Sequence, residues 1–245
     1  IIGLKIKKIS RRSKFLLFFF NNNSVMLVHL GMTGKFFFIN QKNAKYKTSF
    51  YYDINEDKDK KHDRVIFHLS GNQKLIYNDV RKFGFIKFIK NINLEQNLHL
   101  KNLGPEPLEK KFNFSYFKQY IVNKNRTIKD ILMDQKFISG LGNIYVNETL
   151  FFSGIKPTKK VKNLSEGEIR KIIKFIKRIL SKAIALGGSS IKNFSSNNGK
   201  KGLFQQYFCV YGKKGEKCSK KSCGSNIIKI VISNRATFYC DKCQK

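Results

Sequence analysis

Four cysteines near the end of the chain have the spacing of a metal site. Four residues separate Cys218 from Cys223, two separate Cys240 from Cys243, and sixteen lie between the pairs. A tetrahedral Zn²⁺ needs four thiolates at about 2.3 Å, and two tight knuckles joined by a hairpin supply them. Two disulfides are the alternative, but an odd total of five cysteines favours a reduced compartment and a metal. The spacing therefore predicts one structural Zn²⁺, whose four protein ligands leave no catalytic position.

A single arginine lies between the two cysteine pairs. The apolar runs at residues 227–233 and 236–240 predict two strands, with the bend at 234–236. Arg235 would then sit at the tip of a rigid basic ribbon, a shape suited to a DNA groove. An arginine that only solvates a turn is the alternative interpretation.

Two further loops place large apolar side chains at turns. Met32 lies between glycines in residues 29–36, and Arg81 and Phe83 share the turn at 78–85. Local core packing is the common explanation for such residues. The alternative is a wedge, because proteins that act on a base extrude it and insert side chains into the gap.

Residues 139–145, SGLGNIY, predict a glycine-rich turn between two helices. Gly140 and Gly142 permit positive φ angles and a close approach of the backbone. The helix that follows offers unpaired N–H groups to a phosphate, and Asn143 adds a side-chain amide. A plain turn between helices is the alternative.

The order of the elements predicts an α+β fold. β-branched and aromatic runs dominate the first ninety residues and predict an antiparallel sandwich, whereas helical spacing follows, with a capping box at Ser165 and Glu168. We expect a β-sandwich domain at 1–92, a linker at 93–110, a helical domain at 111–204 with a mobile loop at 188–204, and a zinc hairpin at 205–245.

The composition indicates a polyanionic partner. Lys and Arg number 49 against 16 Asp and Glu, a net charge of +33, and so much charge repels itself unless it is neutralised. Nucleic acid is the usual partner and an anionic membrane surface the rival. An A+T-rich genome would also raise the lysine count, but the eight arginines are less easily explained in this way. The longest apolar run, Phe15–Phe20, is too short to span a bilayer.

Five motifs in order carry a family resemblance: HLGMTG, NDVRKFG, LGPEPL, IKDILMDQKFISGLGNIYVNE and NRATFYCDKCQK. Together with the four cysteines they resemble the formamidopyrimidine-DNA glycosylase/endonuclease VIII family over about the whole chain. The resemblance implies an N-terminal β-sandwich, a helix–two-turn–helix domain and a zinc hairpin. It also implies base-excision repair of double-stranded DNA, by excision of oxidised purines such as 8-oxoguanine and formamidopyrimidines, followed by β,δ-elimination as an abasic-site lyase.

The resemblance assigns roles residue by residue. Lys14 matches a strand lysine that donates a proton in β-elimination, and Arg235 matches the hairpin arginine that binds phosphates and assists δ-elimination. The void-filling wedge corresponds to Met32, Arg81 and Phe83. The remaining matches are DNA-binding residues: His62, Arg81, Arg126, Lys129 and Asn143. Loop 188–204 resembles the cover over the extruded base.

One departure bears on activity. The family attacks C1′ with an N-terminal proline followed by an acidic glutamate, whereas this sequence opens at Ile1 and resembles the family some forty residues in. We therefore expect a fragment that is inactive unless Lys14 replaces the proline amine. A non-catalytic reader of damaged DNA and an RNA-binding zinc-ribbon protein are the competing hypotheses. A monomer in the bacterial cytoplasm, associated with the nucleoid, is expected.

Overall fold

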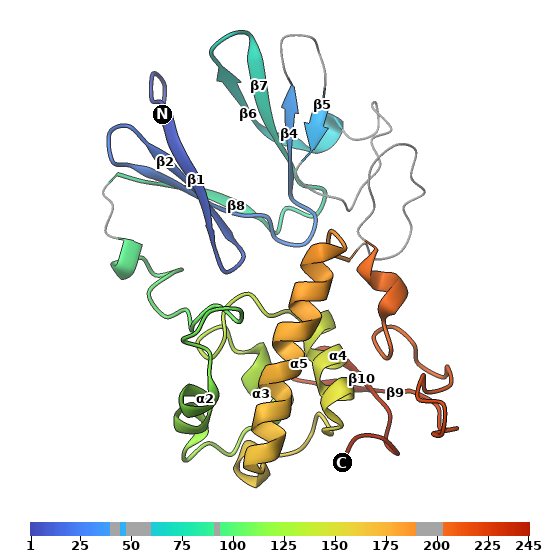
Figure 1. The fold of residues 1–245 in the computed structure, drawn as a ribbon. Helices are drawn as coiled ribbons and strands as arrows, with labels where there is room; N and C mark the ends of the chain where they lie inside the picture. The colour runs from blue at the N-terminus through green and yellow to red at the C-terminus, as the bar shows by residue number, and fades with distance from the viewer. Residues whose placement is uncertain (40–44, 48–59, 91–93, 190–202) are drawn as a thin grey trace. The chain divides into compact units, whose positions relative to one another are not determined.

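The structure is a computed structural model that describes residues 1–39, 45–47, 60–90, 94–189 and 203–245. The chain divides into two compact units, residues 1–94 with 187–205 and residues 95–186 with 206–245. Figure 1 shows antiparallel sheets in the first unit and helices with a β-hairpin in the second. The predicted α+β class is confirmed.

The first unit contains two four-stranded antiparallel sheets. One has the order β1-β2-β3-β8 and the other β5-β4-β7-β6. The strands are β1 (Ile6–Arg12), β2 (Phe15–Phe20), β3 (Val25–His29), β4 (Lys35–Ile39), β5 (Lys45–Lys47), β6 (Asp63–Leu69), β7 (Gln73–Asn78) and β8 (Phe85–Ile89), with a 3-10 turn, η1, at Lys60–His62.

The two sheets pack face to face through a shared core. Phe18, Met26 and Val28 of the first sheet cluster with Phe36 and Tyr77 of the second. This confirms the predicted sandwich.

Strand β4 was not expected from the sequence, because residues 29–36 were assigned to a loop around the glycines of HLGMTG.

Four helices build the second unit: α2 (Phe114–Ile121), α3 (Ile128–Met133), α4 (Asn143–Ser153) and α5 (Glu166–Ala185). Side-chain caps begin three of them, from Asn113, Thr127 and Ser165. The capping box predicted at Ser165 and Glu168 is present. Short 3-10 turns complete the unit's helical content: η2 (Leu94–Gln96) and η4 (Phe204–Tyr207), which straddle the boundaries, and η3 (Val161–Asn163).

The turn between α3 and α4 is closed by one glutamine. The side-chain oxygen of Gln135 accepts from the N–H of Gly140 at 2.8 Å, and its amide donates to the carbonyl of Leu141 at 3.0 Å. Gly140 has a φ of 80°, which a residue with a side chain rarely adopts. The predicted glycine-rich turn between two helices is therefore confirmed.

The C-terminal hairpin consists of β9 (Ile228–Ile232) and β10 (Arg235–Tyr239). Its bend is Ser233–Asn234, both with positive φ. The predicted bend at 234–236 was therefore wrong, since the observed bend begins one residue earlier and ends two residues earlier. Arg235 is the first residue of β10, paired with Ile232. This position gives the arginine a fixed backbone beside the bend.

Within the described part of the chain, no helix is both long and apolar enough to cross a membrane. Of the loop predicted at 188–204, only the ends are described. Ser189 bridges Leu203, and residues 190–202 lie outside the described part.

Candidate nucleic-acid interface

A cavity of about 430 Å³ lies between α3 and the bend of the hairpin, within the second unit. Arg126, Lys129 and Arg235 supply three cations to its wall, and Asp130 and Asp134 supply two carboxylates. The Arg126 guanidinium donates to Asp134 at 2.7 Å. Arg235 is exposed. The structure therefore brings three of the predicted phosphate-binding cations to one pocket.

Lys129 is buried at the base of this cavity, with 1% of its surface exposed. Its ammonium donates to the Oδ1 of Asn143 at 2.5 Å. Burial and then the nearby charge of Arg235 lower the pKa of Lys129 to about 7, while Asp130 opposes them. The ammonium is thus poised to lose its proton near neutral pH, and an anion in the pocket would favour the charged form.

Two residues that the sequence analysis did not single out fix the hairpin to α3. The hydroxyl of Ser233 donates to the Oδ1 of Asp130 at 2.7 Å, and the Oδ2 of Asp130 accepts from Thr127, the cap of α3. Burial works to raise the pKa of Asp130, but the hydrogen bonds from Ser233 and Thr127 outweigh it and hold the pKa low. The charged Asp130 therefore joins the start of α3 to the bend beside Arg235.

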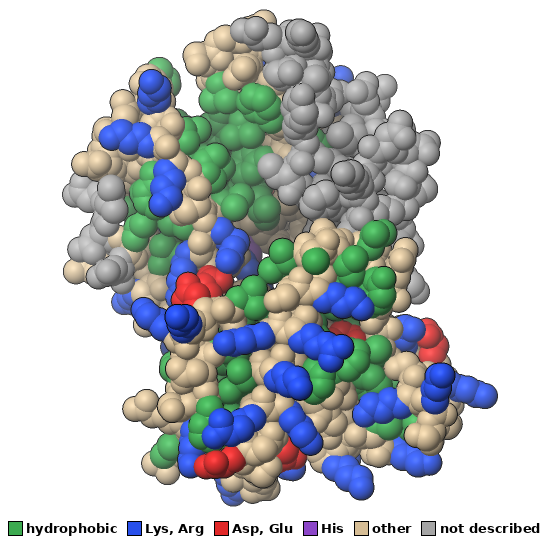
Figure 2. Space-filling model, viewed as in Figure 1, with side chains coloured by type: hydrophobic (Ala, Val, Ile, Leu, Met, Phe, Trp, Pro, Cys, Tyr) green, Lys and Arg blue, Asp and Glu red, His purple; other side chains and the backbone are tan. Residues whose placement is uncertain are grey.

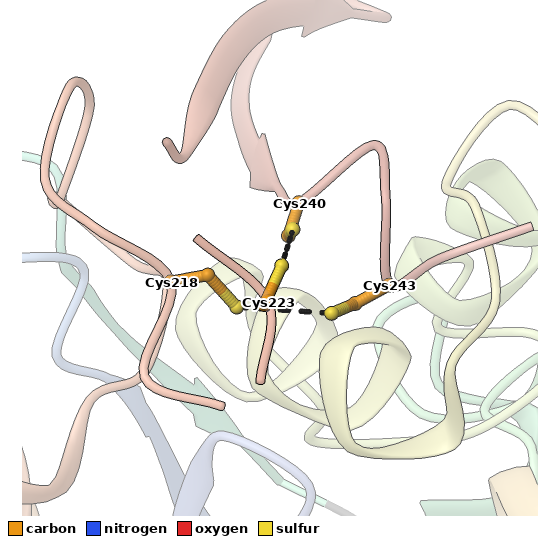
Figure 3. A group of neighbouring side chains, drawn as sticks. All are labelled: Cys218, Cys223, Cys240 and Cys243. Carbon is orange, nitrogen blue, oxygen red and sulfur yellow. Dashed lines mark hydrogen bonds between the residues drawn. The ribbon is translucent and has the colours of Figure 1, made fainter. Parts of the chain in front are cut away.

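The four predicted metal ligands converge at the base of the hairpin. The sulfurs of Cys218, Cys223, Cys240 and Cys243 all lie within 4.8 Å of one another, and all four are free thiols. Figure 3 shows the side chains pointing at a common centre, with sulfur contacts of 3.8 and 3.4 Å. A tetrahedron of 2.3 Å bonds has edges of about 3.8 Å. The geometry fits a Zn²⁺ ion and contradicts two disulfides.

A buried carboxylate joins α4 to the segment that enters the cysteine cluster. Glu148 accepts from the N–H groups of Cys209, Val210 and Tyr211 at 2.8, 3.1 and 2.8 Å. Burial raises the pKa of Glu148, and the three hydrogen bonds work in the opposite direction. The motif GNIYVNE contains this glutamate, but nothing in its spacing indicated that it would bind a loop sixty residues later.

The three predicted wedge residues meet on the surface of the first unit. The guanidinium of Arg81 stacks over the ring of Phe83 at 4.5 Å and donates to the sulfur of Met32 at 3.3 Å. Met32 is 65% exposed and Phe83 56% exposed. Local core packing, the alternative interpretation, is therefore wrong for these two side chains.

The turn that carries Arg81 and Phe83 is held by Asp79, a residue that the sequence analysis missed. Its carboxylate accepts from the N–H groups of Gly84 and Arg81 and from the hydroxyls of Tyr77 and Thr33. Burial works to raise the pKa of Asp79, but these hydrogen bonds hold it low.

Gly31 lets the loop of Met32 lie close to the turn of Phe83. Its φ is +63°, and a Cβ there would lie 2.6 Å from the Phe83 carbonyl carbon. Any larger residue would separate the loop of Met32 from the turn of Phe83.

His62 and Lys14 also lie in the first unit. The carbonyl of His62 accepts from the N–H of Asp79 at 3.0 Å, which places η1 beside the wedge turn. Lys14 lies in the two-residue turn between β1 and β2, so the expectation of a strand lysine was wrong. The predicted site residues thus form two groups, one in each unit.

Family models match both parts of the chain. The formamidopyrimidine-DNA glycosylase N-terminal domain matches residues 1–86, and the H2TH domain of the same enzyme matches residues 103–195. The chain belongs to the formamidopyrimidine-DNA glycosylase family. The family that the five motifs indicated is thereby confirmed.

Curated relatives agree over the whole chain. The formamidopyrimidine-DNA glycosylase of Rickettsia bellii is 42% identical over 245 residues, which are 100% of this chain and 84% of that protein. The enzyme of a Bradyrhizobium species is 37% identical over 249 residues, covering 99% and 84%.

Solved structures of the family have the same fold. A Lactococcus lactis Fpg variant bound to Fapy-dG-containing DNA superimposes with a TM-score of 0.83 at 36% identity, covering 99% of this chain and 83% of that one. The MutM (Fpg) protein of Thermus thermophilus gives 0.81 at 31% identity, covering 99% and 84%.

Proposed function

We propose that this protein acts in base-excision repair, where it binds damaged double-stranded DNA and excises oxidised purines as a DNA glycosylase. The observation that carries the proposal is the pocket in which Arg126, Lys129 and Arg235 converge. Three donors on rigid elements suit the oxygens of a phosphate, and a guanidinium binds two of them at once. The complexes of family members with Fapy-dG and abasic-site DNA support this partner.

The wedge residues take the second role in this proposal. A base that leaves the duplex costs stacking energy, and exposed side chains that fill the gap recover part of it. Met32, Arg81 and Phe83 are exposed on the surface. Asp79 holds the turn of Arg81 and Phe83 in place in the protein without DNA. Pre-ordered loops lose less entropy on binding.

Cleavage of the strand is the finer part of the proposal. An amine displaces the damaged base from C1′, and the C1′–O4′ bond then breaks to give an imine on the opened sugar. Loss of the C2′ proton breaks the C3′–O bond, and loss of the C4′ proton breaks the C5′–O bond. Arg235 would neutralise the phosphate that leaves. Lys14 has one of two roles: it donates a proton when another amine attacks C1′, or it is itself the attacking amine and another group donates the proton. The four cysteines would hold a structural Zn²⁺ that fixes the hairpin, and the ion takes no part in the chemistry.

Incubation with a duplex that carries one 8-oxoguanine tests the function. We expect release of the base, strand scission and, with borohydride, a covalent protein–DNA adduct. Lys14→Ala should lose the adduct if Lys14 is the attacking amine, and Lys7→Ala, a change at an exposed position of strand β1, should keep it.

The second candidate is a protein that recognises damage without cutting, which needs only the pocket and the wedge. Preferential binding of 8-oxoguanine duplex with no base release would establish it in place of the enzyme. Binding to lesion and undamaged duplex with equal affinity would contradict both.

A further inference from the structure

Helix α5 carries a stripe of cations that the proposed DNA site does not use. Lys171, Lys174, Arg178 and Lys182 recur at intervals of three and four residues, so they share one face of the helix. All four are exposed. The opposite face is buried: Ile169, Ile172 and Ile176 lie in the core of the second unit, and Ile179 and Ala183 are buried further along the helix.

The carboxylates of α5 do not neutralise this stripe. The helix contains six basic and two acidic residues, and both acids lie in its first turn. Glu166 binds Lys118 at 2.7 Å and Glu168 binds Lys159 at 2.6 Å. In the described part of the chain, no ion pair involves Lys171, Lys174 or Arg178. The ammonium of Lys182 lies over the ring of Tyr207 at 3.6 Å, so Lys171, Lys174 and Arg178 form the part of the stripe whose positive charge no ion pair among the described residues compensates.

The stripe lies away from the phosphate pocket. Helix α4 packs against α5 on one side and against β10 on another, and α5 buries the face opposite the stripe. Figure 1 shows α5 nearest the viewer, with α4 and then the hairpin behind it. Figure 2 shows Lys and Arg side chains gathered along α5 in the same view. One DNA phosphate at the pocket would leave this face open.

The chemistry of the stripe favours nucleic acid over a membrane. A helix that binds a lipid surface inserts an apolar face, and the apolar face of α5 is already buried. From Lys171 to Lys182 the stripe covers about 16 Å of helix, along which duplex DNA carries about ten phosphate charges. Arg178 also brings a guanidinium, and arginine is scarce in this chain.

We propose that the exposed face of α5 is a second, sequence-independent binding site for the phosphate backbone of duplex DNA. A protein with two such sites holds one duplex at the phosphate pocket and a second on α5. It can therefore pass between DNA segments without full dissociation. The inference relies on the proposed function for the first duplex alone.

A bridging measurement on the full chain tests the second site. The protein is saturated with a labelled duplex that carries a stable abasic-site analogue, and a second, undamaged duplex with an acceptor label is added. Energy transfer between the labels reports two duplexes on one protein. We expect K171Q/K174Q/R178Q to weaken capture of the second duplex by roughly tenfold or more and to lower its salt slope by about 2–3. Affinity for the first duplex should stay within about twofold.

The matched control removes the same charge elsewhere in this unit, at exposed Lys101, Lys110 and Lys111. K101Q/K110Q/K111Q should bridge like the unaltered protein. Equal bridging by the α5 variant, or an equal loss in the control, would overturn the proposal. A third result would also overturn it: the unaltered protein binds phosphatidylserine vesicles, and the α5 variant loses this binding but still bridges two duplexes. Failure to bind the first duplex would contradict the proposed function, and failure to capture the second would contradict the α5 site alone. The two failures are therefore distinguishable.

Discussion

The side-chain amide of Asn143 donates to the carbonyl of Ala236 at 2.9 Å, although 93 residues separate them. The same side chain accepts from the ammonium of Lys129 at 2.5 Å. Asn143 therefore joins three elements: α3 through Lys129, α4 through its own backbone, and β10 through Ala236. Arg235 is the residue before Ala236, so this amide fixes the backbone from which the guanidinium extends.

Asn143→Ala should weaken binding to abasic-analogue duplex by about 1–3 kcal/mol, because it removes one of the hydrogen bonds that hold β10 and leaves the buried ammonium of Lys129 without its acceptor. Asn143→Asp is the informative comparison, since it keeps an acceptor for Lys129 and loses the donor to Ala236. Fluorescence anisotropy gives both affinities. Full affinity in the alanine variant would show that the hairpin holds its position without this bond.

Most of the local structure at these sites was predictable, whereas the contacts between distant segments were not. The metal site, the capping box and the glycine-rich turn follow from spacings within a few residues, where the chain dictates geometry. From the residues alone the wedge was one of two alternatives, and the family resemblance favoured it over core packing. Ser233, Glu148 and Asp79 escaped notice because each acts through one hydrogen-bond partner or a few whose position only the tertiary fold decides.

The pKa of Lys129 makes DNA binding depend on pH. Its value of about 7 lies below the usual 10.5, so free protein above neutrality holds a neutral amine. A bound phosphate favours the ammonium, and binding then takes up a proton. We expect affinity to fall as pH rises through about 7 to 9, by at most tenfold per pH unit. Calorimetry in two buffers of different ionisation enthalpy measures the proton uptake.

The same shift changes folding stability in a defined direction. Between about pH 7 and 10 the unfolded chain holds the lysine proton and the folded chain does not, so the free energy of unfolding rises with pH. Lys129→Met should abolish both dependences, while Lys162→Met, at an exposed position, should leave them. Proton uptake that survives in Lys129→Met would assign it to another group.

Glu148 binds the backbone of residues 209–211, which lead into the cysteine cluster. Its substitution should therefore lower the free energy of unfolding. Glu148→Gln keeps the shape but replaces one acceptor oxygen by a donor that faces backbone N–H groups. We expect a loss of about 1–3 kcal/mol in the free energy of unfolding, measured by denaturant titration. Lys213→Gln, a nearby charge change at a half-exposed side chain, should cost less than about 0.5 kcal/mol. Similar losses in the two variants would mean that the three hydrogen bonds contribute little.

If the four cysteines hold the proposed Zn²⁺, its removal should release Arg235 from its fixed position. Zinc binding supplies folding free energy to small metal domains, so chelation should abolish amide protection across β9 and β10. The affinity for abasic-analogue duplex should then fall by at least about tenfold, because a mobile guanidinium loses conformational entropy when it binds phosphate. Cys240→Ser should reproduce the effect. Cys209→Ser is the matched control, since this thiol lies outside the four-sulfur cluster. If the chelated protein kept full affinity and a protected hairpin, packing against Phe151 and Ile227 would be sufficient to hold Arg235, and the metal would be dispensable.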